Sequence, residues 1–239
     1  MTQRKSVNTI LEMAEYKKTG SCKVLVVTGC MAQRYKNEII EEVPEVDAVL
    51  GTTSYGDILK AIREAMEGKH FQEFKDIDYL PEKLGKRVLT TGGHFGYLKI
   101  AEGCDKHCTY CIIPKLRGKF RSVPMERLVT QAKEMAEEGV KELILVAQET
   151  TVYGTDIYGK KSLHILLKEL CKIKGIRWIR VLYCYPEEIY DELIQTMKEE
   201  KKICHYLDLP IQHASDRILK RMGRRTTQAE LVEIVNKLR

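Results

Sequence analysis

The chain has 239 residues, with 40 lysine and arginine residues against 34 aspartate and glutamate residues, an excess of six positive charges. It contains no run of about 18 apolar residues, and residues 1–8 are too polar for a secretory signal, so we expect a soluble, cytoplasmic protein without a membrane partner. A chain of this length can bury one large core or two modest ones. The small positive excess is compatible with an RNA or ribosomal partner and does not require one.

Residues 1–67 alternate short apolar runs with helical patterns, as parallel strands joined by crossover helices do. The predicted helices span residues 7–16, about 35–43 and 55–66, and the predicted strands span 23–28 and 47–50. These elements predict a small, partial doubly wound domain whose sheet is incomplete at its start.

Residues 68–96 break this pattern with charged residues, Pro81 and a Thr-Thr-Gly-Gly run. We interpret them as an interdomain linker with room for a hairpin. A second alternating block, residues 97–239, follows. Its predicted strands span 97–101, 142–147, 178–183 and 206–209. Four βα units are too few to close a barrel, so the expected fold class is α/β, with a partial, open βα barrel after the first domain.

Two helices of the second block have clear boundary signals. A helix predicted over residues 124–138 stops at Gly139, because glycine adopts a left-handed cap at low cost. The last helix begins with Thr227 and Glu230, which are spaced as a capping box.

Three cysteines, Cys104, Cys108 and Cys111, lie within eight positions directly after the first strand of the second block. That place is the carboxyl edge of the sheet, where α/β proteins gather ligands and catalytic groups. Three thiolates there can hold three irons of a 4Fe-4S cluster and leave the fourth iron open to a ligand that is not protein. The alternative is a zinc knuckle completed by His107, although a histidine inside the loop is poorly placed to close the site.

The C-x3-C-x2-C spacing, with Tyr110 before the last cysteine, resembles the radical S-adenosylmethionine superfamily. The resemblance implies that the amino and carboxylate groups of S-adenosylmethionine chelate the open iron. It also implies that an electron from the cluster splits the sulfonium to give a deoxyadenosyl radical, so that the cofactor carries the difficult chemistry.

Five further segments are similar to the methylthiotransferases within that superfamily. They span residues 28–33, 97–104, 111–118, 146–154 and 207–215. The resemblance implies that residues 1–67 are the C-terminal part of the methylthiotransferase N-terminal domain and that residues 97–239 are the first four βα units of the radical SAM domain. The run Gln148-Glu149-Thr150-Thr151 is more similar to the enzyme that modifies an aspartate of a small-subunit ribosomal protein, because the transfer-RNA enzyme usually has Gln-Asn-Val-Asn there.

The resemblance also implies a second 4Fe-4S cluster in the complete enzyme, which takes part in sulfur delivery. Cys30 matches the third of the three cysteines that bind this auxiliary cluster; the alternative is a small buried residue at a strand end. The first two cysteines of that set have no counterpart here, and neither do the last barrel units and the small C-terminal β-barrel. The chain therefore resembles the middle of the enzyme.

Four residues are expected at the cofactor. The resemblance places the backbone and ring of Tyr110 against the adenine, with plain packing as the alternative. Gln148 and Glu149 end one strand at the ligand edge and Gln212 follows another, so they could meet the methionyl or ribose part, with a solvated loop as the alternative. A basic run is expected either as a solvated face or as a surface that steers the substrate: Arg217, Lys220, Arg221, Arg224 and Arg225.

The sequence therefore predicts a transferase, a radical methylthiotransferase that inserts sulfur at an unactivated carbon. The expected carbon is the β-carbon of an aspartate in a small-subunit ribosomal protein, so the expected partner is that protein or the ribosome. A transfer-RNA adenosine methylthiotransferase is the alternative within the class. A non-catalytic iron-sulfur or zinc-binding module is the alternative outside it. No residue pattern identifies the catalytic side chains, the electron donor, the sulfur source or the oligomeric state.

Overall fold

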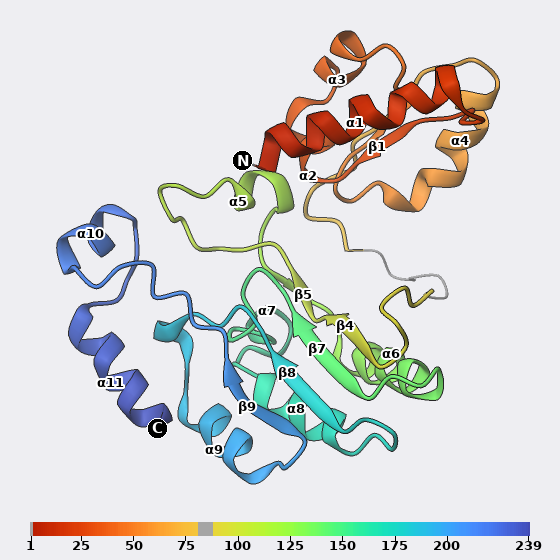
Figure 1. Ribbon diagram of the computed structural model, residues 1–239. Helices are drawn as coiled ribbons and strands as arrows, with labels where there is room; N and C mark the ends of the chain where they lie inside the picture. Colours follow the sequence, from red (N-terminus) through yellow and green to blue (C-terminus); the bar gives the residue numbers. More distant parts are fainter. Residues whose placement is uncertain (1, 81–87) are drawn as a thin grey trace. The chain divides into compact units, whose positions relative to one another are not determined.

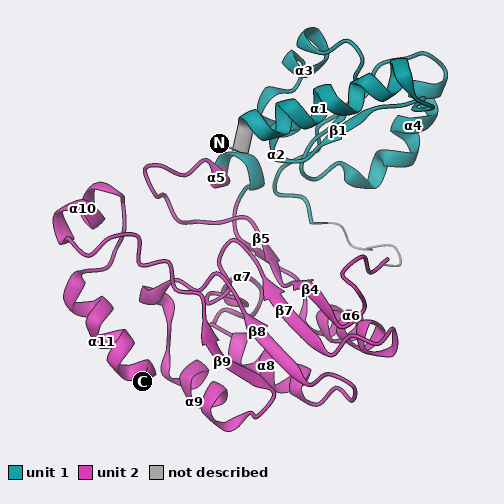
Figure 2. Ribbon diagram, in the orientation of Figure 1, with its two compact units in different colours: residues 1–83, 115–118 teal, residues 84–114, 119–239 magenta. Residues whose placement is uncertain are grey.

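The computed structural model describes residues 2–80 and 88–239 (Figure 1). The chain divides into two compact units (Figure 2). Unit 1 contains residues 1–83 and 115–118, and unit 2 contains residues 84–114 and 119–239. Among the described residues, no helix combines the length and the apolar character needed to cross a bilayer.

Unit 1 is built on a three-stranded parallel sheet in the order β1-β2-β3. Its strands are β1 (Val26–Thr28), β2 (Ala48–Leu50) and β3 (Phe71–Glu73). Its helices are α1 (Thr2–Thr19), α2 (Cys30–Tyr35), α3 (Glu38–Glu42), the 3-10 turn η1 (Tyr55–Asp57) and α4 (Ile58–Met66). The central strand β2 is buried at all three positions, which explains its continuous apolar sequence.

The carboxylate of Asp47 joins α1 to this sheet. It accepts hydrogen bonds from the Lys17 ammonium at 2.7 Å and from the Leu25 backbone N–H at 2.7 Å. A second hydrogen bond joins residues 115–118 to the rest of unit 1: the Thr52 hydroxyl donates to the Leu116 carbonyl at 2.9 Å. Leu116 lies in α5 (Ile113–Arg117), six residues or fewer after the cysteine loop.

Two expectations for this unit need adjustment. The helix predicted at about residues 35–43 is present only over α3, and the separate helix α2 before it was not predicted. Lys36, whose φ of 45° is incompatible with a continuous helix, separates the two. The predicted linker, residues 68–96, contributes β3 to the first sheet and the start of β4 to the second. Residues 81–87 of that segment, including Pro81, lie outside the described residues.

Unit 2 contains an open, four-stranded parallel sheet in the order β4-β7-β8-β9. The strands are β4 (Phe95–Lys99), β7 (Glu142–Val146), β8 (Trp178–Val181) and β9 (Ile203–Leu207). The crossover helices α6 (Met125–Glu137), α8 (Leu163–Cys171) and α9 (Asp191–Glu199) contact β4, β8 and β9 respectively (Figure 1). All four predicted strands are present and the open sheet is confirmed, but the last strand was predicted at 206–209 and lies at 203–207.

The remaining elements of unit 2 lie mainly in the connections at the carboxyl edge of this sheet. They are the antiparallel ribbon of β5 (Ala101–Glu102) and β6 (Arg121–Ser122), the helices α7 (Thr155–Tyr158), α10 (Asp216–Arg221) and α11 (Gln228–Leu238), and the 3-10 turn η2 (Pro186–Glu188). The predicted capping box is confirmed: the Glu230 N–H donates to the Thr227 hydroxyl, and the Glu230 carboxylate accepts from the Thr227 N–H.

Candidate functional site

The cysteine loop begins where β5 ends. Gly103 turns the chain with a φ of 80°, and its N–H donates to the side-chain oxygen of Gln148 at 2.8 Å. Cys104 and Cys108 are buried, whereas Cys111 is exposed. The Cys111 N–H donates to the Cys108 carbonyl at 3.0 Å, which makes the last part of the loop a tight turn. The strand end and Gln148 therefore fix the start of the loop, and the turn fixes its end.

The donor set of this loop fits an iron-sulfur cluster with one open iron. In the described residues no group of three Cys, His, Asp or Glu side chains is already gathered as a metal site. Even so, Cys104 and Cys108 line one cavity, and the Cys104 sulfur accepts a hydrogen bond from the Lys106 N–H at 3.4 Å. Donors of this kind stabilise cluster thiolates. Burial raises the pKa of Cys104, so binding of a metal there would release a proton.

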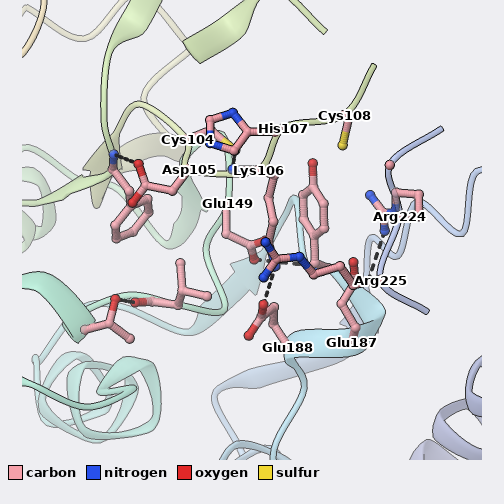
Figure 3. Close-up of a pocket in the computed structure, with 15 residues that line it drawn as sticks. Cys104, Asp105, Lys106, His107, Cys108, Glu149, Glu187, Glu188, Arg224 and Arg225 are labelled. Atoms are coloured by element: carbon pink, nitrogen blue, oxygen red, sulfur yellow. Dashed lines mark hydrogen bonds and ion pairs between the residues drawn. The ribbon is translucent and has the colours of Figure 1, made fainter. Parts of the chain in front are cut away.

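A cavity of about 210 Å³ lies beside the loop, within unit 2 (Figure 3). Both signs of charge line it. Its cations are Lys106, Arg224 and Arg225, and its carboxylates are Asp105, Glu149, Glu187 and Glu188. Such a lining suits a ligand that itself carries an ammonium and a carboxylate.

Arg224 is the most deeply buried of the cations. Its guanidinium donates to Glu187 at 3.0 Å and lies 4.2 Å from the centroid of the Tyr185 ring. Its Nε and Nη1 atoms are buried and make no hydrogen bond to the described protein atoms. Burial lowers the pKa of Arg224, but Glu187, Tyr185 and Cys108 outweigh burial and raise it, so the group stays charged. Two N–H donors are thus available to an anion in the cavity.

Glu149 provides an acceptor that has no partner in the described part of the chain, as Arg224 provides donors without one. It is 1% exposed, and its Oε1 accepts from the N–H and hydroxyl of Thr151 and from the Tyr185 N–H. Its Oε2 is buried and has no partner among the described residues. Burial raises the pKa of Glu149 to about 7, so the carboxyl is poised to bind or release a proton near neutral pH.

Lys106 ties the cysteine loop to the loop after β8. Its ammonium pairs with Glu188, which also pairs with Lys161 at 2.9 Å, and it lies 5.2 Å from the Tyr185 ring. Burial raises the pKa of Glu188, but the hydrogen bonds from Lys106 and Lys161 outweigh burial and lower it. This ionised pair holds the cysteine loop against the rest of unit 2.

The predicted cofactor residues fall into two groups. Glu149 lines the cavity. Gln148 does not line it, but its side-chain oxygen accepts a hydrogen bond from the Gly103 N–H at the start of the loop. Tyr110 is 54% exposed and Gln212 is also exposed, with a left-handed φ of 65°, and neither lines the cavity. Their contacts with a cofactor stay predictions.

Cys30 lies in unit 1, at the start of α2 and half-buried. Its sulfur accepts a hydrogen bond from the Arg117 Nε at 3.1 Å. No second cysteine of the described residues accompanies it in unit 1 except Cys22, which donates to the Val24 carbonyl. Metal binding by Cys30 also stays a prediction.

Sequence reasoning missed the buried role of Arg224, which was expected on a solvated basic face or a steering surface. It also missed the cluster formed by Lys106, Tyr185, Glu187 and Glu188. The sequence position of residues 185–188 could have indicated their place at the site, because they follow a predicted strand at the ligand edge, as Gln148 and Glu149 do.

Two protein-family models match the chain. The Radical SAM superfamily matches residues 98–239, and a second model, described as Uncharacterized protein family UPF0004, matches residues 1–51. The two matches reach both ends of the chain and leave residues 52–97, which include β3, outside them.

Curated relatives are similar over nearly the whole chain. A protein named ribosomal protein uS12 methylthiotransferase RimO, from Lachnoclostridium phytofermentans, is 67% identical over 237 residues, which cover 99% of this chain and 54% of the relative. A protein of the same name from Clostridium perfringens is 54% identical over 239 residues, with 99% and 54% covered. The chain spans about half the length of the curated relatives it matches.

A solved structure shares the fold. The cobalamin-dependent S-adenosylmethionine radical enzyme OxsB, with aqua-cobalamin and S-adenosylmethionine bound, superposes with a TM-score of 0.68. The match covers 99% of this chain and 38% of that chain at 15% identity. At that identity the likeness concerns the fold alone.

We expect replacement of Glu149 by glutamine to change how stability depends on pH. Because its pKa is about 7 in the folded chain and near 4.5 in the unfolded chain, the folded state binds the extra proton between these values, and stability falls as pH rises. The Glu149→Gln change removes that fall. The free energy of unfolding of the variant minus that of the unaltered chain should therefore be about 2 to 3 kcal/mol larger at about pH 8 than at about pH 5. Urea unfolding of the metal-free protein measures this.

Glu188→Gln is the matched control. Since the pKa of Glu188 is lowered in the folded chain, the group is largely ionised in both states above about pH 5, so its effect on stability should be nearly the same at both pH values. A Glu149→Gln effect that is equally independent of pH would contradict the assignment of a raised pKa to Glu149.

Proposed function

Because this chain belongs to the radical SAM superfamily, we propose that Cys104, Cys108 and Cys111 hold a 4Fe-4S cluster whose fourth iron binds S-adenosylmethionine. The observation that carries the proposal is the pairing of this three-thiol loop with a cavity lined by charges of both signs. When bound, the cluster supplies the electron that cleaves S-adenosylmethionine into a hydrogen-abstracting radical.

The side chains of the cavity would bind the amino-acid part of the cofactor. Arg224 offers two N–H donors to the carboxylate, and Glu149 offers a free oxygen to the ammonium. Glu187 and Tyr185 hold the Arg224 guanidinium in place, and Gln148 orients the start of the cysteine loop. Tyr110 and Gln212 are kept as candidates for the adenosine part, on the resemblance alone.

We further propose that the complete protein is a cytoplasmic methylthiotransferase of ribosomal protein uS12. Relatives with that name are 67% and 54% identical to this chain over 99% of its length. In this proposal the product is an aspartate whose β-carbon carries a methylthio group in place of one hydrogen. The partner is uS12 or the ribosome. Modification of transfer RNA is less well supported, because the two relatives are named for the ribosomal substrate.

The auxiliary cluster does not fit the residues of this chain. Cys30 is the one family-matched ligand, and a single thiolate does not hold four irons. We therefore derive no step through that cluster and expect these 239 residues to assemble one cluster and not to complete methylthiolation.

The iron content of reconstituted protein tests the three-cysteine site. The chain should take up about four irons and four sulfides, as one 4Fe-4S cluster requires, and not about eight. Cys104→Ala, Cys108→Ala or Cys111→Ala should each abolish the visible chromophore and the cleavage of S-adenosylmethionine, because two thiolates do not hold a cluster with one open iron. Anaerobic reconstitution with iron and sulfide analysis gives these values.

Cys204→Ala and Cys30→Ala are the controls, and both should keep about four irons. One tetrahedral zinc per chain, with no cleavage of S-adenosylmethionine, would show instead a closed zinc module. Full cleavage activity in any variant of the three loop cysteines would contradict the assignment of that cysteine.

The substrate is tested on the complete protein in its own cell. Deletion of its gene should leave uS12 without the methylthio group on aspartate, while methylthiolated adenosine in transfer RNA stays unchanged. Mass spectrometry of ribosomal proteins and of digested transfer RNA from the same strain measures both. Loss of the modified adenosine with unaltered uS12 would assign the protein to transfer RNA.

A further inference from the structure

The C-terminal end of α10 has an unusual cap. A helix leaves its last four carbonyl groups without partners inside the helix, here those of residues 219–222. The first two are satisfied by a Schellman motif: the Arg224 N–H donates to the Leu219 carbonyl at 2.9 Å, and the Gly223 N–H donates to the Lys220 carbonyl at 3.1 Å. Gly223 supplies the left-handed residue that this motif needs, with a φ of 72°.

The cysteine loop satisfies the other two carbonyl groups. Thr109 donates from its hydroxyl to the Arg221 carbonyl at 3.1 Å and from its N–H to the Met222 carbonyl at 3.1 Å. Thr109 directly follows Cys108. The end of α10 is therefore completed by the segment that carries the proposed cluster ligands, although more than 100 residues separate the two in the sequence.

The two segments also meet backbone against backbone. A Cβ atom on Gly223 would lie 2.9 Å from the His107 carbonyl oxygen and 3.6 Å from the Cys108 Cα. The first distance is shorter than a carbon atom can tolerate, and the obstacle is backbone, which cannot turn aside as a side chain can. Only glycine allows this approach at position 223.

The turn at 221–224 is itself firmly held. Leu219 is fully buried, and the Asp216 carboxylate accepts from the Gln228 N–H at 2.7 Å, which joins α10 to α11. On the other side the Arg224 guanidinium is fixed by Glu187 (Figure 3) and lies against the Tyr185 ring. The turn at 221–224 is therefore held from both sides, and it can support the cysteine loop.

We propose that residues 221–224 form a clasp that fixes the shape of the cysteine loop, with Gly223 and Thr109 as positioning residues for the cluster. The clasp holds residues 107–109, between the start of the loop, which Gln148 fixes, and its end, which the turn from Cys108 to Cys111 fixes. This inference rests on the proposed function of the three cysteines.

A pair of glycine variants tests the clasp. Gly223→Ala introduces both a left-handed alanine and the contact with His107, whereas Gly159→Ala introduces a left-handed alanine at a φ of 69° with no atom within 4 Å. The two therefore share the backbone strain and differ in the contact. Gly223→Ala should lose most of its cluster on reconstitution, measured by iron per chain and visible absorption, and Gly159→Ala should keep it.

A second pair keeps the test valid if Gly223→Ala does not fold. Thr109→Val removes the hydroxyl bond to the Arg221 carbonyl and keeps the side-chain shape, and Thr109→Ser restores the donor. In the metal-free protein, iodoacetamide should alkylate the buried Cys104 and Cys108 about fivefold faster in Thr109→Val, as expected for loss of one hydrogen bond. Thr109→Ser should return the rate close to that of the unaltered chain, and the exposed Cys111 should react equally in all three.

The outcomes separate the clasp from the function on which it rests. Retention of iron by Cys104→Ala would remove the cluster assignment itself. Loss of iron in Cys104→Ala, with full iron in folded Gly223→Ala or unchanged alkylation in Thr109→Val, would overturn the clasp alone. Equal loss of iron in Gly223→Ala and Gly159→Ala would show backbone strain without a role for the contact, and would also overturn it.

Discussion

Parallel pairing of β4, β7, β8 and β9 is the constraint on which the site depends. Because the strands run in one direction, their carboxyl ends lie at one edge of the sheet, and the segment after each strand begins there. The cysteine loop follows β4 and β5, Glu149 follows β7, the 185–188 run follows β8, and Arg224 comes after β9 and α10. One pairing rule thus gathers residues that span more than half of the chain around a cavity of about 210 Å³.

The charges around this cavity are arranged at some energetic cost. Burying a guanidinium or a carboxylate is unfavourable unless partners replace the lost water. Glu187 provides that compensation for one part of Arg224, and Thr151 does so for one oxygen of Glu149. The remaining polar atoms of both groups have no partner among the described residues. A ligand with a carboxylate and an ammonium would complete both sets, so the incomplete compensation is itself evidence of a binding site.

The sequence predicted the features that arise from local pattern. The four strands of the second sheet are short apolar runs, the α11 cap is a four-residue motif, and the cysteine spacing is read directly. It could not predict the burial of Arg224, because that burial follows from a left-handed turn at Gly223 and from packing on Tyr185, a residue 39 positions earlier. The start of the helix predicted at about 35–43 was placed too early for a similar reason, since no local signal shows that Lys36 has a positive φ, which ends α2 before α3 begins.

We propose that the thiolates of Cys104, Cys108 and Cys111 leave one iron open to S-adenosylmethionine. Electron paramagnetic resonance of the dithionite-reduced, reconstituted chain, recorded with and without S-adenosylmethionine, tests it most directly. We expect a 4Fe-4S signal whose g values shift when S-adenosylmethionine is added, because the added ligand would coordinate the open iron. A cluster signal that stays identical at saturating S-adenosylmethionine would contradict the proposed open iron, since it would show a cluster with no iron available to the cofactor.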